Sequence, residues 1–250
     1  MSGSGGYGTA AVVSTLEYTD LGQLINAFRQ ATDDNAVPPL WADDEITRYA
    51  NDTVRDAVER GFLIEDDQTP EICQIAVVAN TANYPLDPRI LKITRARLDV
   101  RRRVLFSVDK ASLDNGVASP YHHLYGGRFW GPSWGTAKGI VFGYIENTTG
   151  IRLVRIPTEN DVLMLTVYRL PLSDMVELSD EPEIKLERRY DLLDGMLARG
   201  YLKHDSETYD AKLAAEHEAK FTQHFGVKID ASVRKKQREP RSNVVRAISF

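Results

Sequence analysis

Cysteine is almost absent from this 250-residue chain, which contains Cys73 alone. A single cysteine excludes an intrachain disulfide and every metal site that is built from several thiolates. No uninterrupted apolar run reaches the roughly 18 residues of a membrane-spanning helix. The first residues also lack the basic and apolar segments of a secretion signal. We therefore expect a soluble protein that is made and kept in a reducing compartment, or released from it only by lysis.

Motifs for catalysis and cofactor binding are missing as well. No GxGxxG follows a strand, and neither GxxxxGK[ST] nor G-x-S-x-G occurs. An HExxH pattern begins at His217 but fails because residue 221 is phenylalanine. His217 and His224 fall on one helix face, where packing is the alternative to metal binding. The neighbours His122 and His123 would point to opposite sides of a strand and so do not easily share a ligand. We predict a non-enzymatic protein without metal or cofactor.

Charge is distributed unevenly along the chain. Lys and Arg number 31 against 36 Asp and Glu, a net charge of -5. A protein whose whole surface coats nucleic acid should be basic, which disfavours that role. The last twenty residues carry six basic side chains and one acidic one, a net charge of +5, so the remaining residues sum to -10. An acidic body with a basic tail is typical of a terminus that contacts a partner.

The N-terminal part is expected to be a flexible leader, residues 1–16, followed by two helices. Asp20 is the expected cap of the first helix, with Gln23 in capping-box spacing, and the prolines of DDNAVPPL end it. Asp43 is the expected cap of the second helix, in which Tyr49 lies on the apolar face. Gly61 is expected to end that helix in the left-handed conformation.

The period of the apolar residues then changes from helical to strand-like. Residues 72–78, 89–100, 104–108, 139–147, 150–157 and 162–170 are expected to form strands. Residues 147–150 are expected to form a hairpin-like turn. Residues 71–172 therefore form a β-rich unit that is inserted between helices.

Helices are expected to return at residue 181, with Asp180 as the cap. The predicted buried face of this helix holds Ile184, Tyr190, Leu193, Leu197 and Tyr201. A last helix runs from Asp210 to Gly226, with Leu213, His217, Phe221 and Phe225 on one side. The expected fold class is α+β, with an antiparallel helical core of residues 17–70 and 173–227 that consists of the N-terminal helices and a C-terminal helical hairpin. A β-rich domain of residues 71–172 is inserted in this core, and residues 228–250 form an extended C-terminal arm.

A glycine- and aromatic-rich segment spans residues 121–144. Its glycines recur every fourth residue, but Pro132 and the lack of a long apolar run favour a loop that leads into a strand. Its aromatic residues and one arginine are suited either to a core flap or to a contact with a partner: Tyr125, Arg128, Phe129, Trp130 and Trp134.

The C-terminal arm is either a solvated terminus or a docking segment. Five of its last seven residues are apolar, which favours docking as an added strand or into a groove. The residues expected to bind are basic in the first half and apolar at the end: Arg234, Lys235, Lys236, Arg238, Arg241, Val244, Val245, Ile248 and Phe250.

Three segments resemble the head-to-tail adaptor (connector) proteins of tailed bacteriophages. LWADDEITRYANDTVRDAVERG resembles an early helix of that family, and NYPLDPRILKITRARLD resembles its β-segment. EPEIKLERRYDLLDGMLARGYLKHDSETYDAKLAAEHEAKFTQHFG resembles its C-terminal pair of helices. The resemblance covers about residues 17–226, and the order of helices, β-insert, helices and tail also fits.

The resemblance implies a structural role at the head–tail junction of the virion, after synthesis in the host cytoplasm. Such proteins form a ring, usually dodecameric, between the portal protein and the tail nozzle, and they extend the channel through which DNA passes. Their C-terminal arms bind the portal, which assigns that role to the arm residues above. We place Tyr125, Arg128, Phe129, Trp130 and Trp134 at the tail side. An acidic channel wall would not hold the phosphate backbone.

Two other classes of protein stay open from the sequence. One is a virion-associated hydrolase that uses His122, His123 and a carboxylate. The other is a monomeric β-domain that binds carbohydrate or a partner through Trp130 and Trp134.

Overall fold

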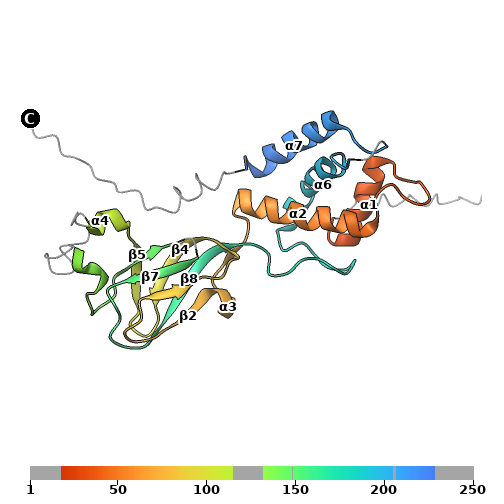
Figure 1. The fold of residues 1–250 in the computed structure, drawn as a ribbon. Helices are drawn as coiled ribbons and strands as arrows, with labels where there is room; N and C mark the ends of the chain where they lie inside the picture. Colours follow the sequence, from red (N-terminus) through yellow and green to blue (C-terminus); the bar gives the residue numbers. More distant parts are fainter. Residues whose placement is uncertain (1–17, 115–131, 148, 205–206, 229–250) are drawn as a thin grey trace, which may run out of the picture. The chain divides into compact units, whose positions relative to one another are not determined.

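The computed structural model describes residues 18–114, 132–147, 149–204 and 207–228 (Figure 1). Backbone contacts divide the chain into two compact units. The first, here called the helical unit, comprises the described residues of Met1–Val54 and Ser173–His224. The second, the β unit, comprises those of Arg55–Leu172 and Phe225–Phe250. Helices and a mixed sheet together confirm the α+β class.

Most of the described helix lies in the helical unit. Its elements are α1 (Leu21–Thr32), the first part of α2 (Asp43–Gly61), α5 (Leu186–Arg189), α6 (Leu192–Gly200) and most of α7 (Ala211–Phe225). Their fully buried large side chains are Leu21, Leu24, Phe28, Ile46, Leu192, Met196 and Phe221. The expected burial of Tyr49 and Leu197 is confirmed.

Two of the predicted helix ends are confirmed by their hydrogen bonds. The Asp20 carboxylate caps α1 by accepting from the Gln23 amide at 2.9 Å. The Asp210 carboxylate accepts from the Lys212 and Leu213 amides at the start of α7. Gly226 follows α7 with a positive φ of 90°, the conformation that glycine adopts without strain.

The predicted ends of α2 were wrong at both termini. Asp43 is the first helical residue rather than the cap, and its carboxylate pairs with Arg29 instead. At the other end, Gly61 is still helical and Phe62 is left-handed, with φ at 48°. The centroid of the Phe62 ring lies 5.4 Å from that of the Tyr168 ring. This contact stabilises a bulky residue in the left-handed conformation, which is otherwise strained.

The helix expected from residue 181 begins later and is broken in two. The Asp180 carboxylate does not cap it, because it accepts from the backbone amides of Val176 and Glu177. Since the helix starts at Leu186, the buried face shifts: Tyr190 is 44% exposed, and Leu192 is buried where Leu193 was expected. The antiparallel pairing of α6 and α7 is confirmed, because Asp191 lies near His224 and Asp194 near His217.

The β unit is built around an eight-stranded mixed sheet. Its strands are β1 (Glu65–Asp66), β2 (Gln74–Val77), β3 (Asn83–Pro85), β4 (Ile90–Leu98), β5 (Arg103–Ser107), β6 (Gly143–Glu146), β7 (Gly150–Val154) and β8 (Asp161–Arg169). The order is β1-β8-β4-β5-β6-β7-β3, and β2 also pairs with β8. β5 and β6 run parallel, and the other described pairs run antiparallel. Alternate residues of β8, among them Leu163, Leu165 and Val167, are buried in the core.

Local details of the sheet confirm one prediction and correct another. The turn over residues 147–150 is closed by a 2.8 Å bond from the Asn147 amide to the Gly150 carbonyl. A Cβ at Gly150 would lie 2.7 Å from the Tyr84 carbonyl oxygen, so β3 can approach only a glycine here. The strand expected from Ile72 starts two residues later, because Ile72 and Cys73 belong to the one-turn helix α3 (Pro70–Cys73).

Candidate functional site

Trp134 is the member of the predicted tail-side group that lies within the described residues. It sits in a 3-10 helix, Pro132–Gly135, and is 9% exposed. Its indole Nε1 donates to an Asp114 carboxylate oxygen at 2.6 Å, and the Arg152 guanidinium lies 5.0 Å from the ring centroid. It packs in a small core cluster with Leu113, Phe142, Ile145 and Val154. Of the two alternatives, core flap or partner contact, this burial favours the core for Trp134.

The other predicted contact residues lie outside the described part of the chain. They are Tyr125, Arg128, Phe129 and Trp130, the pair His122 and His123, and the arm from residue 229 onward, which includes every predicted portal-binding side chain. Their contacts stay predictions.

His217 and His224 join two helices. His217 Nδ1 lies 2.8 Å from an Asp194 carboxylate oxygen, and His224 Nδ1 lies 3.3 Å from one of Asp191. The Tyr201 ring stacks on His217 at 5.9 Å between centroids. Each imidazole therefore faces one carboxylate across the α6–α7 contact, an arrangement suited to packing. The described residues contain no group of three or more His, Cys, Asp and Glu side chains that could hold a metal ion.

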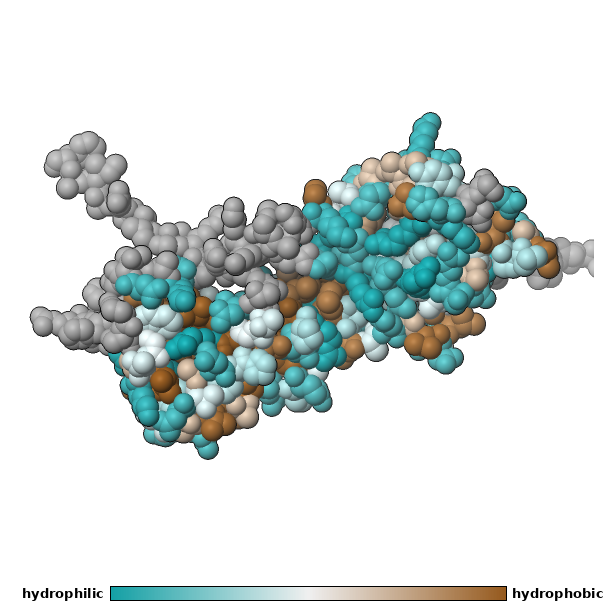
Figure 2. Space-filling view, viewed as in Figure 1, coloured by the Kyte–Doolittle hydropathy of each residue, from teal (hydrophilic) through white to brown (hydrophobic). Residues whose placement is uncertain are grey.

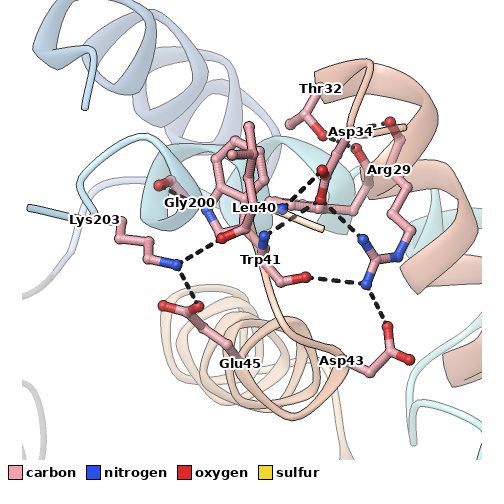
Figure 3. A network of polar contacts seen from close by, with 10 residues as sticks. Arg29, Thr32, Asp34, Leu40, Trp41, Asp43, Glu45, Gly200 and Lys203 are labelled. Atoms are coloured by element: carbon pink, nitrogen blue, oxygen red, sulfur yellow. Dashed lines mark hydrogen bonds and ion pairs between the residues drawn. The ribbon is translucent and has the colours of Figure 1, made fainter. Parts of the chain in front are cut away.

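A buried carboxylate organises the loop between α1 and α2 (Figure 3). Asp34 is 5% exposed and accepts from Arg29 Nη1 at 2.9 Å and from the Leu40 amide at 2.9 Å. The second guanidinium nitrogen of Arg29 donates to the Trp41 carbonyl at 3.0 Å and to Asp43 at 2.6 Å. Both ends of the loop are thus tied to one arginine and one aspartate.

The same loop is tied to the C-terminal end of α6. The Trp41 indole donates to the Gly200 carbonyl at 3.3 Å (Figure 3). The Lys203 ammonium donates to the Leu40 carbonyl at 2.8 Å and to Glu45 at 2.9 Å. Although burial opposes it, the hydrogen bonds from Lys203 and Tyr49 lower the pKa of Glu45. These bonds stabilise segments that are separated by some 160 residues in the sequence.

This anchored loop presents an apolar tip. Residues 35–39 are all exposed, and Val37 is 97% exposed beside two prolines. A rigid base under an exposed loop is the arrangement in which binding loops occur. The sequence interpretation took this stretch only as the end of a helix. The signal it missed is the pair of acidic residues at 33 and 34 ahead of Val37-Pro38-Pro39. If one of these carboxylates is buried, it must accept hydrogen bonds from neighbouring groups and so fix the loop.

The titratable groups of the β-unit core are structural. Asp66 and Arg169 form a buried ion pair at 2.5 Å. Although burial alone would raise it, hydrogen bonds from Thr69, Arg169 and the Gln68 amide hold the pKa of Asp66 well below its usual range. Burial, with Asp66 nearby, raises the pKa of the Cys73 thiol to about 11. A thiol with that pKa is largely protonated at neutral pH and is a poor nucleophile.

None of the helices in the described ranges is long and apolar enough to cross a membrane.

Comparison with known proteins bears out the resemblance of the sequence. No curated protein sequence matches the chain. A family model described as SU10 adaptor protein matches residues 19–246, nearly the whole chain. The chain therefore belongs to the SU10 adaptor protein family, which consists of phage head–tail adaptors.

Proposed function

We propose that this protein forms a ring, dodecameric as in the adaptors it resembles, between the capsid portal and the tail, and that the ring extends the DNA channel. The family assignment carries this proposal, because an adaptor must bind virion components on two sides. Family membership also indicates a structural, non-enzymatic protein. We assign the portal side to the C-terminal arm and the tail side to the aromatic segment around Trp130.

The distribution of charge supports an arm that binds elsewhere in the assembly. The sequence ranges of the helical unit hold 21 acidic and 9 basic residues, a net charge of -12. Residues 225–250 hold 7 basic and 2 acidic residues, a net charge of +5. The family match reaches residue 246, so it includes the basic part of the arm. A basic segment with an apolar end can bind through charge pairing and apolar burial together.

Two arm variants test this assignment. Removal of residues 244–250 should weaken portal attachment at every salt concentration, because the lost contacts are apolar. Replacement of Arg234, Lys235 and Lys236 by alanine should weaken it most at low salt, since screening reduces charge pairing as salt rises. Attachment is measured by co-sedimentation of purified chain with portal particles between about 50 and 500 mM salt.

The matched control is replacement of Lys110, Lys212 and Lys220, three lysines of the folded units, which removes the same charge outside the arm. Thermal unfolding should be unchanged in all variants, and the three control lysines are exposed. If truncation after residue 227 leaves attachment at the wild-type level, the arm is a solvated terminus and the portal assignment is wrong.

A further inference from the structure

An exposed segment of the helical unit is held in one conformation although it has no regular secondary structure. In residues 175–180, here called the ridge, the Asp180 carboxylate accepts from the amides of Val176 and Glu177, both at 2.8 Å. Asn51 bonds to both the amide and the carbonyl of Met175 at 2.9 Å. The Gly22 amide donates to the Leu178 carbonyl at 2.9 Å. The ridge is therefore preorganised.

The ridge presents apolar side chains in acidic surroundings. Val176 is 74% exposed and Leu178 is 63% exposed, with the exposed Glu177 between them. Figure 2 shows hydrophobic side chains on the surface of this unit among mostly hydrophilic ones. Adjacent exposed apolar residues on a fixed backbone mark an interaction site more strongly than scattered ones do. The net charge of -12 in this unit favours a partner that is basic as well as apolar.

The β unit carries a surface with that composition. Residues 99–104, here called the hairpin tip, comprise the turn between β4 and β5 and the first two residues of β5, and they read DVRRRV. Val100 is 73% exposed and Val104 is exposed, and Arg102 between them is exposed as well. The tip is also fixed: the Val100 amide donates to Asp161 at 2.9 Å, and the Arg102 amide donates to the Asp99 carbonyl at 3.1 Å.

We propose that the hairpin tip of one copy docks on the ridge of the neighbouring copy in the ring. Arg102 then faces Glu177, and Val100 and Val104 cover Val176 and Leu178. The inference rests on the proposed ring and identifies the surfaces that join its subunits. The partner is a second copy because the basic and apolar complement of the ridge is on this same chain.

The unequal charge of the two units favours a head-to-tail contact over a two-fold contact between ridges. Two ridges brought together about a two-fold axis would oppose acidic units, each with a net charge of -12, and that arrangement is repulsive. A contact between two different surfaces is heterologous, and its repetition gives a ring where the rotation closes and an open filament where it does not. Head-to-tail docking of tip on ridge is therefore compatible with the proposed ring and not with an isolated two-fold dimer.

Cysteine cross-linking tests the contact, because the native Cys73 is fully buried. The chain with both Val100→Cys and Val176→Cys, treated with a short bis-maleimide on assembled particles, should give a ladder of cross-linked oligomers. Each single variant should give monomer, and a mixture of the two should give dimer. The matched control is Val37→Cys with Val176→Cys, which pairs the ridge with an even more exposed valine outside the hairpin tip.

Charge reversal supplies the second test. Arg102→Glu or Glu177→Arg alone should reduce the ladder severalfold, and the two reversals combined in one chain should restore it. Lys110→Glu, an exposed reversal elsewhere in the β unit, should leave it unchanged. A ladder missing from particles that contain the chain, or dimers formed by Val100→Cys alone, overturns this inference and leaves the adaptor role standing. Particles that lack the chain contradict the proposed function itself and the inference with it.

Discussion

Gly195 of α6 lies directly against Phe221 of α7. A Cβ built at Gly195 would be 2.8 Å from the Phe221 ring and 2.5 Å from the Thr53 methyl group of α2. Glycine in a helix interior costs about 1 kcal/mol relative to alanine, so its presence here reflects packing. Three helices approach one another at this residue.

Gly195→Ala should destabilise the helical unit although alanine favours the helix. Overpacking of a closed contact costs about 1–3 kcal/mol, which exceeds the gain in propensity. Gly61→Ala is the matched control, because its new Cβ meets only the flexible end of the Leu63 side chain. Urea unfolding compares both variants with the wild type. A midpoint for Gly195→Ala equal to or higher than that of the wild type would show that the three helices can separate at no cost.

Asp34→Asn should loosen the loop between α1 and α2. The substitution leaves Arg29 without its buried anionic partner, and loss of one member of a buried pair costs about 3–5 kcal/mol at full burial. Arg29 is partly exposed, so we expect about 2 kcal/mol. The control Asp43→Asn removes the exposed partner of the same arginine and should cost less than about 1 kcal/mol. Equal effects of the two substitutions on the unfolding free energy would contradict the anchoring role of Asp34.

Stability of the β unit should fall in acid because of Asp66. Its folded pKa is lowered, so its contribution is fully present above the unfolded pKa, near 4, and is lost as the pH falls through the folded value. Asp66→Asn should cost about 3–5 kcal/mol at pH 7, because Arg169 loses its charge partner. Below about pH 4 its unfolding free energy should depend less on pH than that of the wild type. Asp67→Asn, an exposed neighbour, is the control, and parallel acid curves for wild type and Asp66→Asn would refute the assignment.

Trp130 and Trp134 should have different roles. Trp134→Ala should destabilise the β unit by about 3–5 kcal/mol, since its indole is buried and hydrogen-bonded. Trp130→Ala should leave unfolding unchanged and block attachment of the tail, if this residue contacts the tail as we propose. Electron microscopy of particles made with each variant, together with thermal unfolding, separates the two effects. Complete tails with Trp130→Ala would remove Trp130 from the tail-side surface.

The sequence by itself determined the features that depend on neighbouring residues. The cap of α1 at Asp20, the cap of α7 at Asp210 and the turn at residues 147–150 all involve partners within four positions along the chain. The apolar, strand-like run of residues 162–170 likewise predicted β8. The family resemblance rested on the same kind of local pattern.

Other features were decided only by the tertiary structure, because the partners are remote in the sequence. Asp43 pairs with an arginine of the preceding helix, and Asn51 of α2 holds the Met175 backbone, 124 residues away in the sequence. Trp41 finds its acceptor 159 residues away, at Gly200. Local propensities differ by a kilocalorie per mole or less, whereas leaving a buried polar group unpaired costs about 1–3 kcal/mol. A buried polar group such as the Trp41 indole is therefore placed by an acceptor that is remote in the sequence, and no local pattern reveals that acceptor.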